Sequence, residues 1–78
     1  MVTNMNVTVK LFASLRIGRF KSEVWEMPAG SKVIDILAKL GLQGREVAIL
    51  RVNGRDVPDE QKLMDGDIIT LFPPMGGG

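Results

Sequence analysis

The sequence predicts an α+β protein in which a mixed β-sheet of four to five strands packs one face on one helix. Three observations predict this fold class: runs of alternating apolar and polar residues, one apolar stripe at helical spacing, and turn signals between these segments. With 78 residues the chain is long enough for one small domain, which buries about 60–65% of the surface of its unfolded chain.

The first predicted element is a hairpin of two strands. Side chains alternate between apolar and polar over Asn6–Ala13 and again over Glu23–Met27, which ends before a proline. The apolar face of the first strand would carry Val7, Val9 and Leu11. Between the strands, Ser14–Lys21 mixes a glycine with basic residues and predicts a loop. We interpret its positive charges as solvated surface, with contact to an acidic partner as the alternative.

A helix follows the hairpin. Ser31 is the predicted N-cap, and Asp35 lies in the first turns, where the helix dipole favours an acidic side chain. Gly41 is the predicted C-terminal stop. The apolar stripe at spacing i, i+3, i+4 and i+7 consists of Val33, Ile36, Leu37 and Leu40. Because burial of each such side chain is worth about 1.5–3 kcal/mol, we interpret the stripe as core packing and not as a ligand site.

The second half of the chain begins with another predicted strand, Val47–Asn53. Asn53-Gly54 is typical of a two-residue hairpin turn. The return strand, Arg55–Val57, is expected to be a short edge strand, because Pro58 has no N–H to donate to a ladder.

The last strand is predicted to lie inside the sheet. Asp59–Met64 is expected to form one short helical turn, and Asp65-Gly66 a further turn. The strand Asp67–Phe72 then carries apolar side chains on both faces. A strand with this pattern is typical of the centre of a sheet.

The chain ends in the tail Phe72-Pro73-Pro74-Met75-Gly76-Gly77-Gly78. The two prolines have no N–H, so the segment cannot continue a β-ladder and stays extended. The glycines lack a Cβ, so the tail fits a narrow groove of a partner and its carboxylate can enter a cleft closed to bulkier residues. We therefore expect a folded domain over residues 1–72 and a flexible tail over residues 73–78. Such a carboxylate can attack the α-phosphate of ATP held by a partner enzyme, which gives an acyl-adenylate open to a sulfur or amine nucleophile.

The composition excludes many classes of protein. With no Cys and no His, the chain cannot build a disulfide, an ordinary zinc or iron–sulfur site, or a Cys/His or Ser/His triad. We therefore expect no bound metal or cofactor and no enzyme activity of its own. A net charge of +1 gives no reason to expect nucleic acid as a partner. No apolar run approaches the roughly 18 residues of a membrane span, and no signal peptide is visible, so a cytoplasmic protein without membrane contact is expected.

Three pieces of the sequence together resemble one family. They are Val9-Lys10-Leu11-Phe12-Ala13 followed by Leu15-Arg16, the turn Asp65-Gly66-Asp67, and the tail from Phe72 to Gly78. These pieces resemble the ubiquitin-like sulfur carriers of the MoaD/ThiS type, and most of all the small subunit of molybdopterin synthase, whose members commonly end in F-P-P-V-A-G-G. On this match Met75 stands at the valine position and Gly76 at the alanine position. The resemblance implies the β-grasp, ubiquitin-like fold.

The resemblance also implies a function for the tail. A ubiquitin-activating-enzyme-like adenylyltransferase would use ATP to adenylate Gly78, which would then carry sulfur as a thiocarboxylate. In the molybdopterin branch the tail would insert into the molybdopterin synthase large subunit and donate sulfur for the molybdenum or tungsten cofactor. Phe72 and Met75 are of the types that anchor interfaces, although a core position is the alternative for Phe72. The expected partner-binding residues are Phe72, Pro73, Pro74, Met75, Gly76 and Gly77.

Other uses of the same tail stay open. A triple glycine also occurs among carriers of the thiamine branch, which donate sulfur to thiazole synthase. The activated Gly78 could instead be passed to a lysine of another protein, and a plain interaction domain with an inert tail is a third alternative. The intact mass of the protein from its host would separate these uses, because oxygen-to-sulfur exchange marks a carrier and lysine-linked adducts mark a modifier.

Overall fold

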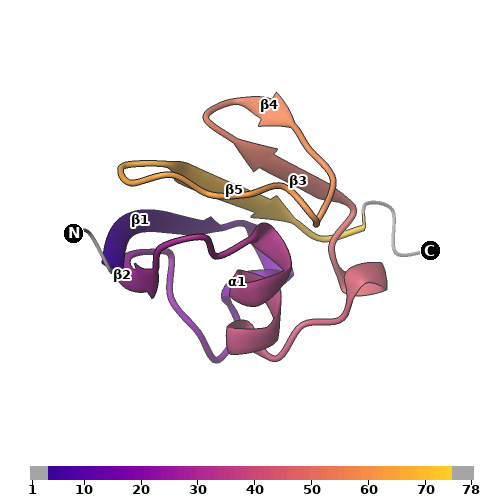
Figure 1. The fold of residues 1–78 in the computed structure, drawn as a ribbon. Coiled ribbons are helices and arrows are strands. Elements are labelled where there is room, and N and C mark those ends of the chain that lie inside the picture. The colour runs from indigo at the N-terminus through magenta and orange to yellow at the C-terminus, as the bar shows by residue number, and fades with distance from the viewer. Residues whose placement is uncertain (1–3, 75–78) are drawn as a thin grey trace.

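The computed structural model describes residues 4–74, which form one five-stranded sheet and one α-helix. The strands are β1 (Asn4–Leu11), β2 (Ser22–Pro28), β3 (Ile49–Val52), β4 (Arg55–Asp56) and β5 (Ile68–Phe72). The helix α1 spans Val33–Leu40, and two short 3₁₀ turns, η1 (Ala13–Arg16) and η2 (Gly44–Glu46), lie in the connections. In Figure 1, α1 lies on one side of the sheet, as the sequence predicted.

β5 lies at the centre of the sheet, whose strand order is β2-β1-β5-β3-β4 (Figure 1). It pairs in parallel with β1, where Leu11 is the partner of Leu71, and antiparallel with β3, where Leu50 is the partner of Leu71. β1 and β2 form an antiparallel hairpin. The predicted hairpin, the short edge strand and the central place of the last strand are therefore confirmed.

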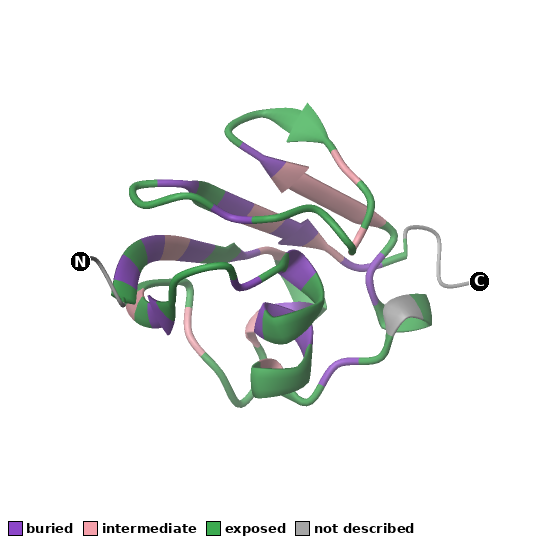
Figure 2. Ribbon diagram, viewed as in Figure 1, coloured by how far each residue is buried: buried purple, intermediate pink, exposed green. Residues whose placement is uncertain are grey.

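The core lies between the sheet and α1. Figure 2 shows buried and more exposed residues alternating along β1. The fully buried side chains are Leu11, Ile36, Ile69, Leu71, Val7, Val9 and Val33. The predicted helix stripe is confirmed, because three of its members are buried and Leu40 packs against them. The other face of β5 is open in the described chain, where Ile68 keeps 40% of its surface exposed.

The start of α1 differs from the prediction. Lys32, and not Ser31, is the N-cap, with an extended backbone (φ −115°, ψ 168°). The Ser31 hydroxyl is already used, because it donates to the Pro28 carbonyl at 2.7 Å and closes the turn before the helix. The Asp35 carboxylate accepts a hydrogen bond from the Lys32 N–H at 2.8 Å, as in half of a capping box. The predicted stop is right, since Gly41 adopts the left-handed conformation (φ 76°) typical of helix ends.

All five strands have boundaries shifted from the prediction. For example, β1 begins at Asn4 and not Asn6, and β4 ends at Asp56 and not Val57. β1 ends at Leu11, because Ala13 adopts left-handed backbone (φ 53°), which is uncommon for a residue with a Cβ. Ala13 opens η1, so the predicted loop contains a 3₁₀ turn. The strand predicted at Val47–Asn53 is shorter in the structure, where β3 covers only Ile49–Val52.

The segment between β4 and β5 is not helical, so the short helical turn predicted over Asp59–Met64 is wrong. The segment makes a turn and then runs beside the start of α1. The Val33 N–H donates to the Gln61 carbonyl at 2.9 Å, and the Ile34 N–H donates to the Asp59 carbonyl at 2.8 Å. These N–H groups belong to the first turn of α1 and have no partner inside the helix. The carbonyls of the segment accept from these N–H groups. This tertiary pairing overrides the local tendency of the segment to form a helical turn.

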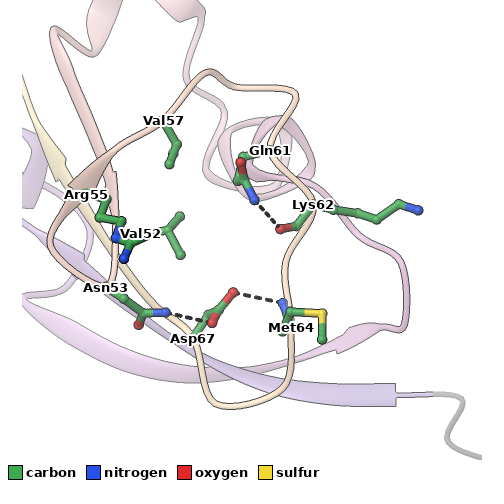
Figure 3. A pocket seen from close by; sticks show the side chains of 8 residues that line it. All are labelled: Val52, Asn53, Arg55, Val57, Gln61, Lys62, Met64 and Asp67. Carbon is green, nitrogen blue, oxygen red and sulfur yellow. Dashed lines mark hydrogen bonds between the residues drawn. The ribbon is translucent and has the colours of Figure 1, made fainter.

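The turn between β3 and β4 is the predicted two-residue turn. Asn53 (φ 54°) and Gly54 (φ 82°) both have positive φ, as a type I′ turn requires. The Asn53 side chain ties this turn to β5, because its oxygen accepts from the Ile68 N–H at 3.0 Å and its nitrogen donates to Asp67 at 2.8 Å. Asp67 also accepts from the Met64 N–H at 2.8 Å. Figure 3 shows the two bonds to the Asp67 carboxylate, from Asn53 and from Met64, among the residues that line a cavity of about 460 Å³.

Replacing Asp67 with alanine is expected to lower the free energy of unfolding by about 1–3 kcal/mol, because the Asn53 amide and the Met64 N–H lose their acceptor at a partly buried site. Urea denaturation of both proteins measures this loss. Asp56→Ala is the matched control: it removes a carboxylate from an exposed ion pair with Arg51, so it should cost about 1 kcal/mol or less. Equal stability of Asp67→Ala and wild type would contradict the structural role of Asp67.

Candidate functional site at the exit of the tail

The tail leaves the domain at the end of β5. The Phe72 carbonyl still accepts a hydrogen bond from the Ala48 N–H at 2.9 Å. Pro73 and Pro74 have no N–H to donate, so the ladder cannot continue through them. Pro73 is buried and Pro74 is exposed, so the chain passes from the interior to the surface within two residues.

Phe72 stacks on Phe12 beside this exit. The ring centroids are 4.5 Å apart and the rings are inclined by 17°. The parallel register of β1 and β5 brings the two residues together, because Phe12 follows Leu11 as Phe72 follows its partner Leu71. Both rings are half-buried and lie outside the buried cluster. The alternative of a core position for Phe72 is therefore wrong, and the aromatic pair, Phe12 and Phe72, is available on the open face of the sheet.

Two guanidinium groups border the aromatic pair. The Cζ of Arg16 lies 5.1 Å from the centroid of Phe12, and the Cζ of Arg51 lies 6.0 Å from that of Phe72. The Arg16 Nε donates to the Leu11 carbonyl at 2.7 Å, and the Arg51 Nε donates to Asp56 at 2.7 Å. These bonds hold each guanidinium beside its ring through one nitrogen. A partner would meet flat apolar rings and oriented N–H donors together, the combination that interface hot spots favour.

A depression of about 480 Å³ borders the first residues of the tail. Its lining comes from η1 and the loop after it, the segment around η2, and the tail itself. The lining residues are Ser14, Leu15, Arg19, Leu42, Arg45, Glu46, Pro73 and Pro74. The tail thus begins between the aromatic pair and a depression with two arginines. This arrangement is suited to binding a partner. It presents aromatic faces, cationic hydrogen-bond donors and a chain exit that the two prolines stiffen.

Some predicted site residues fall outside the described chain. Met75, Gly76, Gly77 and Gly78 lie outside the described residues, so their roles stay predictions. The sequence did not predict that Phe12, Arg16 and Arg51 surround the point where the tail leaves β5. One signal could have found Phe12: like Phe72, it ends an alternating run at a position opposite to the buried face.

Within residues 4–74, no helix is long and apolar enough to cross a membrane. No group of three or more acidic side chains in this range lies close enough together to hold a metal ion.

The model of the ThiS family matches residues 9–78, almost the whole chain. The chain belongs to the ThiS family. The match runs from the second half of β1 through β5 and the tail, so it includes every element that surrounds the exit.

Solved structures show what this ThiS-family chain is similar to. A Pyrococcus furiosus protein provisionally described as molybdopterin converting factor subunit 1 is 31% identical, with a TM-score of 0.77 over 91% of this chain and 99% of that chain. The HVO 2177 protein of Haloferax volcanii is 30% identical, with a TM-score of 0.79 over 100% and 91% of the two chains. Small archaeal modifier protein 1 of Methanosarcina acetivorans is 27% identical, with a TM-score of 0.73 over 96% and 98%. The predicted MoaD/ThiS resemblance and β-grasp fold are confirmed.

Membership of the ThiS family shows the general class of function but not the specific role in molybdopterin synthesis that the sequence predicted. The chain has the fold of small ubiquitin-like sulfur carriers and protein modifiers. Members of this family work with activating enzymes and partner synthase subunits. The descriptions of the similar proteins name a molybdopterin factor in one case and a protein modifier in another, so the family leaves both uses of the tail open.

Proposed function

We propose that the chain is a sulfur carrier whose C-terminal Gly78 is adenylated, converted to a thiocarboxylate, and used to donate sulfur in the synthesis of the molybdenum or tungsten cofactor. The observation that carries this proposal is the exit of β5, where Phe72 stacks on Phe12 and two prolines separate the sheet from a run of glycines. The identity of 31% to a protein described as molybdopterin converting factor subunit 1 supports the molybdopterin branch.

The proposed chemistry takes place in partner enzymes. An oxygen of the Gly78 carboxylate attacks the α-phosphorus of ATP, the bond to pyrophosphate breaks, and an acyl-adenylate forms. Hydrosulfide from a sulfur donor then attacks the carbonyl carbon, a C–S bond forms, and AMP leaves with the electrons of the broken C–O bond. The product is a thiocarboxylate, and one ATP is consumed. The partners would be an activating adenylyltransferase and then the large subunit of the synthase, while the chain itself needs no bound cofactor.

The described residues would serve this chemistry by presenting the tail. Fixing a flexible backbone costs about 1–2 kcal/mol per residue, so a partner that clamps the glycines must supply that free energy. Pro73 and Pro74 reduce the cost for the first part of the tail, because their φ angles are already restricted. The aromatic pair then offers a flat apolar surface on which the partner can gain binding energy next to the tail.

The direct test is the intact mass of the purified chain after incubation with the activating enzyme of its host, ATP and sulfide. The expected result is the mass change of one oxygen-to-sulfur exchange, placed at Gly78 by fragmentation and absent when ATP is left out. An unchanged mass, under conditions in which the same enzyme converts another carrier of the ThiS family, would refute the proposal.

Protein modification is the second candidate function. The similarity in fold and the 27% identity to small archaeal modifier protein 1 favour it. In this case an amine attacks the same acyl-adenylate, and the tail ends in an amide bond to a lysine. Fragmentation of conjugates recovered from the host would show Gly78 joined to lysine side chains, whereas a pure carrier gives only the thiocarboxylate.

A further inference from the structure

The charges of the chain are separated along the sheet, although its net charge is only +1. β1 and β5 run in the same direction, so their carboxyl ends meet where the tail leaves (Figure 1). Six of the ten Lys and Arg residues lie at this end, and we call them the basic belt. The belt consists of Lys10, Arg16, Arg19, Lys21, Arg45 and Arg51.

The acidic side chains gather at the opposite end. Glu26 is the register partner of Asn6 near the start of β1, and the Asp65 carboxylate accepts from the Asn6 N–H at 2.8 Å. Six of the nine Asp and Glu residues lie at this end. They are Glu26, Asp35, Asp59, Glu60, Asp65 and Asp67. The remaining acidic residues, Glu23, Glu46 and Asp56, lie at the end with the belt, and Lys32, Arg55 and Lys62 lie at the acidic end. The domain is therefore polarised by an excess of positive charge around the tail and an excess of negative charge at the opposite end.

The belt is not neutralised within residues 4–74. There the one ion pair is that of Arg51 with Asp56, and its side chains are 42% and 77% exposed. Arg16 and Arg19 donate to backbone carbonyls, which leaves their charges uncompensated. Like charges held close together at one end raise the free energy of the isolated domain, and a negative surface that covers them relieves this repulsion.

The belt surrounds the surfaces that a partner of the tail must approach. Lys10, Arg16 and Lys21 line a depression of about 280 Å³ together with Phe12. Arg19 and Arg45 line the other depression together with Glu46, Pro73 and Pro74. A partner that receives the tail therefore has to cover these cations or come very close to them.

We infer that the basic belt docks on an acidic protein surface, which rims the cleft that receives the tail in the activating enzyme. This inference rests on the proposed function. Aromatic rings bordered by arginines are typical of protein interfaces, whereas a phosphate backbone would have to run over the half-buried aromatic pair and a buried proline. The acidic opposite end also opposes the approach of an extended polyanion. Complementary charge speeds encounter and aligns the exit with the cleft.

A pair of charge-swapped variants tests the inference. K10E/K21E/R45E changes three exposed belt residues for which no hydrogen bond of the charged group is found in residues 4–74. K32E/R55E/K62E makes the same change of net charge at exposed positions of the opposite end. The affinity of the full-length wild type and of each variant for the activating enzyme is measured by titration calorimetry between low and high NaCl, beside thermal melts.

The belt variant is expected to bind about tenfold or more weakly at low salt, and its affinity should depend less on salt than that of wild type. The opposite-end variant should stay within about threefold of wild type. Equal losses in the two variants, or no loss in the belt variant while wild type is still adenylated, would overturn the inference and leave the proposed function standing. Belt-dependent binding of an oligonucleotide that is tighter than binding of the enzyme would also overturn it. A wild type that the enzyme neither binds nor adenylates would overturn both.

Discussion

Adding one alanine after Gly78 is expected to abolish ATP-dependent adenylation while leaving the domain folded. One residue moves the terminal carboxylate by about 3.3–3.6 Å, which equals or exceeds the near-attack distance of about 3–3.5 Å between reacting atoms. Deleting Gly78 should have the same effect, because the carboxylate then stops short of the α-phosphate. Neither change touches β5, α1 or the aromatic pair. Pyrophosphate exchange with the activating enzyme of the host measures adenylation.

The matched control is an alanine added after Met1, which lengthens the chain by the same residue at the other end. This variant should support exchange at the wild-type rate, and all four proteins should melt at nearly the same temperature. Full exchange from the chain extended after Gly78, with intact mass showing that the extra alanine is still present, would mean that the terminal carboxylate is not the reacting group.

Replacing Ile69 with alanine should cost about 2–5 kcal/mol of the free energy of unfolding. Ile69 is fully buried and lies on β5 between Val9 of β1 and Val52 of β3, so truncation leaves a cavity at the centre of the sheet. The total free energy of unfolding of a domain is only about 5–15 kcal/mol. The variant should therefore unfold at a much lower urea concentration than wild type.

Ile68→Ala is the matched control for this prediction. It removes the same atoms from the neighbouring residue, whose side chain lies on the open face and is 40% exposed. Its expected cost is about 1 kcal/mol or less. Similar losses for the two variants would show that the open face of β5 is covered and that the core does not lie on one side of the sheet alone.

The elements that depend on local patterns could be predicted from the sequence. The alternation in β1, the stripe of α1 and the Asn53-Gly54 turn each follow from residues close together in the chain, and each was confirmed. The tail was predicted in the same way, since prolines and glycines act through their own backbone geometry, and beyond Pro74 it stays a prediction. The fold class follows from the order of these elements.

The errors arose where hydrogen-bonding groups find partners that the pattern does not show, either within one turn or between distant segments. Ser31 has the residue type of an N-cap, but its hydroxyl closes a turn with Pro28. Asp59 and Gln61 carry carbonyls that accept from the first turn of α1, so their segment makes a turn and does not form a helix. The Phe12–Phe72 stack was missed for a related reason, because it depends on the parallel register of β1 and β5, which no local pattern encodes.

The tail is joined to the innermost strand, and this gives the domain a mechanical property. A force applied to the tail acts on β5 along the strand axis. β5 is hydrogen-bonded to β1 on one side and to β3 on the other. The bonds between strands lie across the direction of the force, so they resist it together and do not open one after another, as they would if an edge strand were peeled away. In the proposed function, a partner that draws the tail into a cleft would therefore pull against the hydrogen bonds of two neighbouring strands at once.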